Sequence, residues 1–192
     1  WSPDESTING SNLKRYERWL AEHYQLNFST YHELWQWSID HLDDFWKSIF
    51  EFFDVIAEGA LVPVRTGNEM PNIRWFENIK LNYAEHIFRN AQPAAPAIIW
   101  SSERQDVTIL TWEELRRDTS ALQSFFIQSG LSTGDRVVGY LPAIPEATIA
   151  FLAANSLGAI WSSCSPDFGT QSVIDRFKQI EPEILIATDH YV

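Results

Sequence analysis

The segment Trp161–Gly169 carries the residue types best suited to chemistry. It reads Trp-Ser-Ser-Cys-Ser-Pro-Asp-Phe-Gly, begins within a predicted buried strand over 159–163, leaves the carboxyl end of that strand and leads into a predicted helix from Thr170. Ligands of open parallel sheets bind at the carboxyl ends of the strands. Asp167 would oppose a phosphate at the helix start, because its carboxylate lies beside the free N–H groups. Two roles for Asp167 therefore stay open: capping of the helix, which is the commoner one, and contact with a ligand.

The remaining reactive side chains show no catalytic spacing. Cys164 has no neighbouring base at a telling distance in the sequence, so we expect a small buried thiol rather than a nucleophile. His32 and His41 lie nine residues apart, which does not place two imidazoles on one helix face. The chain has no phosphate-binding Gly-rich loop, GxGxxG, GxSxG, CxxC or HExxH motif. We therefore predict neither a metal site nor a catalytic residue among these 192 residues.

Composition and charge exclude several classes of protein. The 192 residues are 45% hydrophobic, which excludes a disordered chain, and the net charge of −12 would repel nucleic acid. The apolar stretch Val137–Trp161 has the length of a membrane span, but Pro142, Pro145, Glu146 and Asn155 interrupt it, so we expect buried core and no membrane partner. A single cysteine and the absence of an apolar leader at Trp1 predict a reducing, cytoplasmic location.

Residues 1–90 form one expected part, a helical extension rich in tryptophan. Apolar spacing predicts a helix over 12–24, a second helix after the cap Thr30 with Glu33 reaching back, and a third after Asp43. The stretch 59–74 has no sustained periodicity and is expected to be an extended connector, followed by a short helix over 81–88. We expect the many aromatic rings to pack these helices rather than to bind a ligand.

Residues 91–192 form the second expected part, of the α/β class. Thr111 and Glu114 form a capping box that opens a helix ending near Gly130. From Val107 onward strands and helices alternate, which predicts a parallel sheet with helices on both faces. The expected strands are 107–110, 136–141, 159–163 and 184–188, and the further helices are 145–157 and 170–180.

Several ordered motifs resemble a known family. Leu-Thr-Trp-Glu-Glu-Leu at 110–115, Gly-Asp-Arg-Val at 134–137, Tyr-Leu-Pro-Ala-Ile-Pro-Glu-Ala at 140–147 and Leu-Gly-Ala at 157–159 resemble the early region of AMP-forming acyl-CoA synthetases. Trp-Phe-Glu at 75–77 is similar to the amino-terminal extension of the acetyl-CoA synthetase branch. The resemblance implies the first part of the adenylate-forming subdomain, and it makes this chain an amino-terminal fragment.

The loop at 164–169 resembles the acetoacetate-activating members of that branch rather than those with a Gly-Gly-Phe loop. The resemblance implies a ligase that uses ATP, Mg²⁺, acetoacetate and coenzyme A and that forms an acyl-adenylate before the thioester. It also implies that Ser165–Gly169 approaches the pantetheine of coenzyme A. Asp167, Phe168 and Gly169 are then contact residues, not an acid or a base.

The family's phosphate loop, nucleotide-binding residues and catalytic lysine are expected beyond Val192. We therefore expect the fragment alone to make no adenylate, to bind none of the cofactors tightly, and to self-associate through surface that truncation leaves bare. Two alternatives stay open. One is a synthetase for another short carboxylic acid, and the other is a non-catalytic module whose tryptophan-rich helices bind a partner protein.

Overall fold

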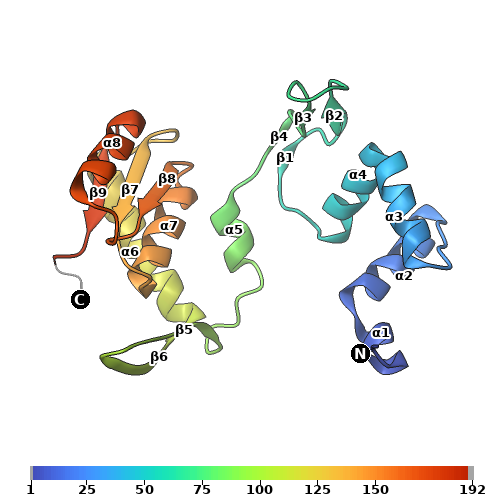
Figure 1. The fold of residues 1–192 in the computed structure, drawn as a ribbon, viewed down its shortest axis with the longest axis horizontal. Helices are drawn as coiled ribbons and strands as arrows, with labels where there is room; N and C mark the ends of the chain where they lie inside the picture. The colour runs from blue at the N-terminus through green and yellow to red at the C-terminus, as the bar shows by residue number, and fades with distance from the viewer. Residues whose placement is uncertain (1, 190–192) are drawn as a thin grey trace. The chain divides into compact units, whose positions relative to one another are not determined.

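The computed structural model describes residues 2–189 (Figure 1). The chain groups into two compact units that divide between Leu81 and Asn82. Four helices and four two-residue strands belong to the first unit, and the second unit begins just before helix α5, Tyr83–Phe88. Each unit has buried residues of its own.

The first unit opens with four helices, of which the sequence predicts all but the first. They are α1 Glu5–Gly10, α2 Asn12–Tyr24, α3 Tyr31–Asp40 and α4 Leu42–Phe52. The bounds of α2 match the prediction, and Thr30 caps α3 by accepting a hydrogen bond from the Glu33 N–H at 3.2 Å. The Glu33 carboxylate reaches back to the N–H of Ser29, at 2.6 Å, instead of closing a box on Thr30.

Aromatic rings pack these helices around a small core. Tyr16, Leu20 and Leu34 are buried, and rings from α2, α3 and α4 surround them. Ser48 is fully buried; its Oγ donates to the Phe45 carbonyl at 2.7 Å and accepts from the Tyr16 hydroxyl at 2.5 Å. Burial raises the pKa of Tyr16, which keeps that hydroxyl a donor.

The stretch expected to be an extended connector folds back on itself instead. Strand β1, Glu58–Gly59, pairs with β4, Ile79–Lys80, and β2, Arg65–Thr66, pairs with β3, Arg74–Trp75, both antiparallel. Arg65 Nε lies 2.9 Å from Asp43 Oδ1 at the start of α4. The Trp46 and Trp75 rings meet edge to face with centroids 6.0 Å apart. Pairings of two residues leave no periodicity in a sequence, which is why the pattern did not predict them.

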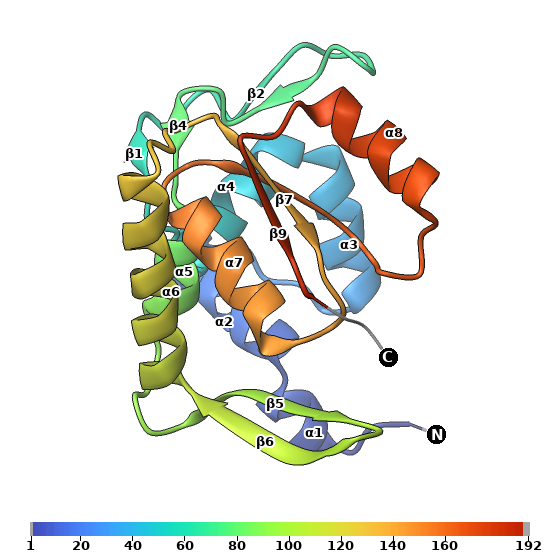
Figure 2. The same cartoon turned by 90° about the vertical axis from the view of Figure 1, so that its left-hand side faces the viewer.

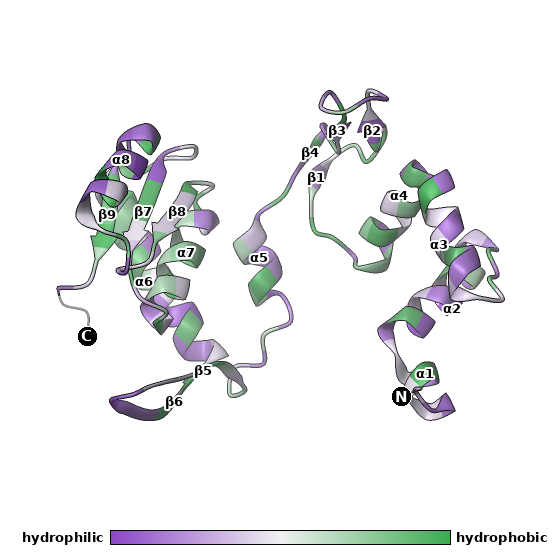
Figure 3. Cartoon of the chain, in the orientation of Figure 1, coloured by the Kyte–Doolittle hydropathy of each residue, from purple (hydrophilic) through white to green (hydrophobic). Residues whose placement is uncertain are grey.

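The second unit contains the predicted parallel sheet. Its strands are β7 Arg136–Tyr140, β8 Ile160–Cys164 and β9 Ile184–Ala187, in the order β8-β7-β9 and all parallel. The connecting helices are α6 Trp112–Gln128, α7 Pro145–Ser156 and α8 Thr170–Ile180. Apolar residues concentrate on β7, β9 and α7 (Figure 3), and the central strand β7 is buried at Val137, Val138 and Gly139, as expected inside an α/β layer.

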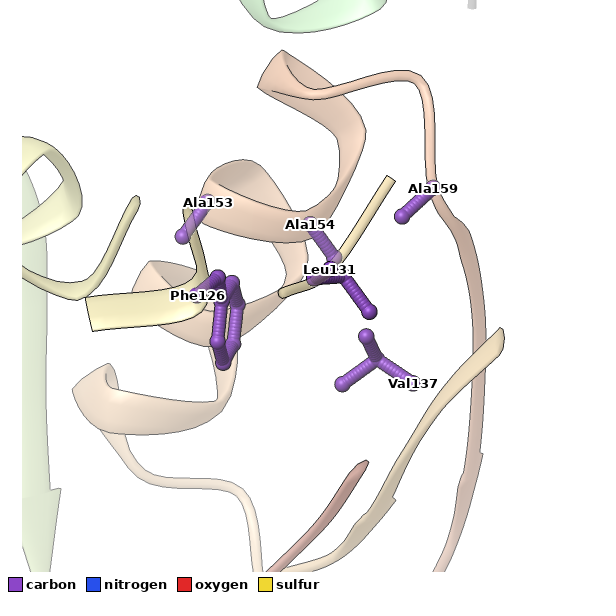
Figure 4. Close-up of a cluster of buried hydrophobic side chains, with 6 residues drawn as sticks. All are labelled: Phe126, Leu131, Val137, Ala153, Ala154 and Ala159. Atoms are coloured by element: carbon purple, nitrogen blue, oxygen red, sulfur yellow. The ribbon is translucent and has the colours of Figure 1, made fainter. Parts of the chain in front are cut away.

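Helices cover both faces of this sheet, as predicted. Figure 2 shows α6 and α7 on one side of the strands and α8 on the other. On the first side, Phe126 of α6 and Ala153 and Ala154 of α7 pack with Val137 of β7 (Figure 4). On the second side, Val173 and Phe177 of α8 line one groove together with Tyr140 and Leu185 of the sheet.

The first expected strand of the alternation was assigned to the wrong sheet. Strand β6, Gln105–Thr111, pairs antiparallel with β5, Pro96–Ser102, in a separate two-stranded sheet. Only Glu103 and Arg104 connect β5 to β6, and a connection of that length permits a hairpin but not a parallel crossover. The exposed side chains of Val107 and Ile109 also differ from those of a strand buried on both faces.

The local signals around α6 and α7 are confirmed. Thr111 and Glu114 form the predicted capping box, and Gly130, at φ 87°, follows the end of α6. Pro145 is the first residue of α7, where its missing N–H costs nothing.

Candidate functional site

The loop Ser165–Gly169 leaves the carboxyl end of β8 and leads directly into α8. Its turn is closed by local hydrogen bonds: Ser165 Oγ donates to Asp167 Oδ2 at 2.8 Å, and the N–H of Phe168 donates to the Ser165 carbonyl at 3.2 Å. The Asp167 N–H in turn donates to Ser165 Oγ at 3.3 Å. Ser165 therefore shapes the loop, and the predicted contact residues Asp167, Phe168 and Gly169 lie together on the exposed side.

The capping role considered for Asp167 is wrong. The N-cap of α8 is Gly169, and no side chain caps the helix. The Asp167 carboxylate is satisfied by the Ser165 hydroxyl, two residues earlier, before it could reach the helix N–H groups. An exposed carboxylate therefore remains in front of the first turn of α8, where it disfavours an anion.

Gly169 has room for a side chain. Its backbone has φ −61° and ψ 148°, which any residue adopts, and a Cβ added there would have no atom within 4 Å. The fold thus gives no reason for a glycine at this position. A close approach of a ligand to the backbone would give one.

The ring of Phe168 is held from α8. The Arg176 guanidinium carbon lies 4.6 Å from the ring centroid, a cation–π geometry. The ring is still 39% exposed, so one part of it is free for a further contact.

Tyr140 holds the same loop from the neighbouring strand. It is the last residue of β7 and lies opposite Cys164, the last residue of β8. Its hydroxyl is 3.1 Å from the Pro166 carbonyl oxygen and 3.2 Å from that of Phe168. Sequence reasoning missed Tyr140 and Arg176. The available signal concerned Tyr140, which lies near the end of a strand that the sequence predicts to run beside β8.

An apolar groove of about 500 Å³ lies between α8 and the sheet, and Tyr140, whose hydroxyl contacts the loop, is one of its lining residues. Its other apolar lining residues are Val173, Ile174, Phe177, Pro182 and Leu185, and Lys178 and Glu181 bring one charge of each sign. Cys164 is buried, as expected of a structural thiol. The loop and the groove together suit a neutral, flexible chain better than a charged group.

A second cavity, of about 770 Å³, lies between the β5–β6 hairpin and the segment that follows β7. Trp100 Nε1 donates to the Ala143 carbonyl at 2.8 Å across its base. Glu103 and Arg104 bring opposite charges to the cavity, so its lining favours neither an anion nor a cation.

His32 and His41, the two histidines considered from the sequence, each have a different neighbour. His32 stacks on Trp35, with ring centroids 5.2 Å apart, and His41 Nδ1 is 3.9 Å from Asp44 Oδ2. Within residues 2–189, no group of three or more His, Cys, Asp or Glu side chains is arranged to hold a metal ion. In the same range, no helix has the length and apolar character needed to cross a membrane.

Comparison with known proteins extends this description. A family described as "AMP-binding enzyme" matches residues 86–192, and one described as "Acetyl-coenzyme A synthetase N-terminus" matches residues 31–87. The acetoacetyl-coenzyme A synthetase of Rhizobium meliloti (strain 1021) is 37% identical over 191 residues, which are 100% of this chain and 29% of that protein. The acetoacetyl-CoA synthetase of Danio rerio is 34% identical over 97% of this chain and 28% of its own length.

Solved structures agree with this similarity. Acetoacetyl-CoA synthetase from Streptomyces lividans superposes with a TM-score of 0.94 at 42% identity, over 100% of this chain and 30% of that one. CmiS6 superposes with a TM-score of 0.51 at 26% identity, over 56% of this chain and 27% of that one. The chain thus spans about three tenths of the length of the relatives it matches. Because the AMP-binding match covers more than half of its residues, the chain belongs to the AMP-binding enzyme family.

Proposed function

We propose that this chain is the amino-terminal part of a ligase that joins acetoacetate to coenzyme A. The observation that carries the proposal is the match to acetoacetyl-CoA synthetases over essentially the whole chain, including the extension before residue 86. In the proposed reaction, a carboxylate oxygen of acetoacetate attacks the α-phosphorus of ATP and pyrophosphate leaves. The thiol of coenzyme A then attacks the acyl carbon, loses its proton and displaces AMP.

The part assigned to this chain is the guidance of the thiol substrate. Asp167, Phe168 and Gly169 would contact the pantetheine arm, which is uncharged and partly apolar. The neighbouring apolar groove, the open space over Gly169 and the exposed ring of Phe168 support this assignment. The Asp167 carboxylate disfavours the phosphates of the nucleotide at the same position. The loop would also help to keep water from the adenylate, which hydrolyses readily.

ATP supplies the adenylyl group and Mg²⁺ neutralises its phosphates in this scheme. We assign no residue of this chain to either of them, because no phosphate-binding motif occurs among the 192 residues. The residues that bind ATP and catalyse adenylation would lie in the remaining length that the relatives possess. The single cysteine fits a reducing compartment, and we place the ligase in the cytoplasm.

The test is acetoacetate-dependent exchange of pyrophosphate into ATP by the complete protein, followed by thioester formation on addition of coenzyme A. Acetate, butyrate and 3-hydroxybutyrate serve as competing acids. Exchange that is fastest with acetoacetate supports the proposal, and a clear preference for another acid would replace the substrate. No exchange with any acid would reject the activity and favour a binding module.

The 192-residue chain alone is the matched negative control, and we expect it to give no exchange. Its self-association stays a prediction, which sedimentation of the isolated chain would check. The exposed side chains of Ile99, Val107 and Ile109 on the β5–β6 hairpin motivate it.

A further inference from the structure

We propose that Tyr140 and Arg176 are positioning residues for the thiol substrate, because they hold the loop Ser165–Gly169 from two different elements. The inference rests on the proposed function, since it assumes that this loop meets coenzyme A. Neither residue belongs to the loop. Tyr140 ends β7, and Arg176 lies on α8.

Tyr140 acts on the backbone of the loop. A phenolic hydroxyl has one hydrogen to donate, and here the carbonyls of Pro166 and Phe168 share it, at 3.1 and 3.2 Å. These two carbonyls belong to the Pro166–Asp167 and Phe168–Gly169 peptide units, so the contact sets the direction of both units. The tyrosine ring lines the groove with Val173 and Leu185. Phenylalanine would therefore keep the packing and remove only the donor.

Arg176 acts on the side chain of the loop. Its guanidinium lies over the Phe168 ring and leaves that ring partly exposed. The loop lacks any capping side chain at the start of α8, and its own hydrogen bonds all involve Ser165. The orientation of the Phe168 ring and of the Pro166–Asp167 and Phe168–Gly169 peptide units thus depends on contacts from outside the loop.

The main experiment uses the complete ligase and the variant Tyr140→Phe. We expect the KM for coenzyme A to rise about three- to tenfold, which is the effect of losing one hydrogen bond. Pyrophosphate exchange, which needs no thiol, should stay within about twofold of wild type. The matched control is Tyr83→Phe. The Tyr83 ring packs on Phe151, and within residues 2–189 its hydroxyl makes no hydrogen bond. An unchanged KM in Tyr140→Phe, or an equal loss of exchange, would overturn the inference.

Arg176→Gln tests the contact between Arg176 and the Phe168 ring. It also tests the positioning role if Tyr140→Phe does not fold. A positioning role raises the KM for coenzyme A and for pantetheine by the same factor, since the loop meets the part that both thiols share. A direct contact of Arg176 with the phosphates of coenzyme A would raise the KM for coenzyme A alone, and that result would reject the positioning role.

Hydrogen–deuterium exchange separates this inference from the proposed function. Amides of residues 167–169 should exchange faster in Tyr140→Phe than in wild type, whether or not the protein activates acetoacetate. Faster exchange combined with absent ligase activity would reject only the proposed function. Unchanged exchange would reject the anchoring of the loop even in an active ligase.

Discussion

The indole ring of Trp161 lies over Gly139, in the space that the Cβ of any other residue would take. A Cβ built on Gly139 would lie 2.7 Å from Cη2 and Cζ2 of that ring. Gly139 belongs to the central strand β7 and Trp161 to its neighbour β8, so the contact joins two strands on the face that α7 covers. Position 139 therefore requires glycine for its small volume and not for its backbone conformation, because Gly139 has no positive φ angle.

Gly139→Ala should therefore destabilise the second unit. The extra methyl group must displace a large ring inside a packed layer, which costs about 1–3 kcal/mol. Urea unfolding followed by tryptophan fluorescence would measure the change. Equal stability of the variant and wild type would contradict the contact with Trp161.

Gly169→Ala should leave the stability of the protein unchanged and weaken its use of coenzyme A. The added methyl group meets no atom within 4 Å and the backbone angles suit alanine, so stability should change by less than about 0.5 kcal/mol. In the complete ligase, the KM for coenzyme A should rise if the pantetheine passes close to this backbone. Thermal melting and thioester kinetics, measured on the same preparation, check both statements. A KM equal to that of wild type would remove Gly169 from the proposed contact residues.

Ser48→Ala should cost more than Tyr16→Phe. Removing the Ser48 hydroxyl leaves the Tyr16 hydroxyl buried without its acceptor, at about 1–3 kcal/mol. Removing the Tyr16 hydroxyl leaves Ser48 bonded to the Phe45 carbonyl, so the loss is about 1 kcal/mol. Chemical denaturation of both variants and of the double variant gives the coupling energy. The reverse order would show that Ser48 is not the acceptor.

Glu114 should make the stability of α6 depend on acidity. The backbone N–H of Thr111, and then its hydroxyl, lower the pKa of Glu114 below its usual 4.5 by donating to the carboxylate. A lowered pKa in the folded state stabilises the protein above the unfolded value, and this contribution is lost as the pH falls through the folded value. Wild type should thus melt above Glu114→Gln near about pH 7, and the difference should shrink as the pH falls below 4.5 and through the lowered pKa of Glu114.

The control for this pH dependence is Glu113→Gln. Glu113 shares the first turn of α6 but takes no part in the capping box. Its substitution should produce a smaller difference with weaker pH dependence. A difference between wild type and Glu114→Gln that is constant with pH would contradict the charged capping box.

Sequence patterns predicted features that depend on residues close together in the chain. The cap Thr111, the first helical residue Pro145 and the stop at Gly130 are local, and the structure has all three. The parallel pairing of the three later strands followed from their alternation with helices. The family resemblance, rather than any periodicity, singled out Asp167, Phe168 and Gly169.

The wrong predictions concern residues whose partner lies far away in the sequence, or residues with two possible hydrogen-bond partners close by. β6 pairs with β5 because their connection is too short for a crossover, a feature that the strand–helix alternation did not take into account. Asp167 bonds Ser165 instead of capping α8, since a nearer donor was available. Tyr140 reaches the loop from the neighbouring strand, and spacing along one element cannot reveal such a contact.

The central place of β7 has a consequence for synthesis on the ribosome. One edge of β7 pairs with β8, but the strand that covers its other edge, β9, emerges only after α8 has been translated. At ordinary translation rates this interval lasts on the order of seconds. During it, the backbone amides and carbonyls along one side of Val137–Tyr140 lack their final partner. Nascent chains on one messenger could pair at that edge, and a slow codon after Ile180 would prolong their exposure.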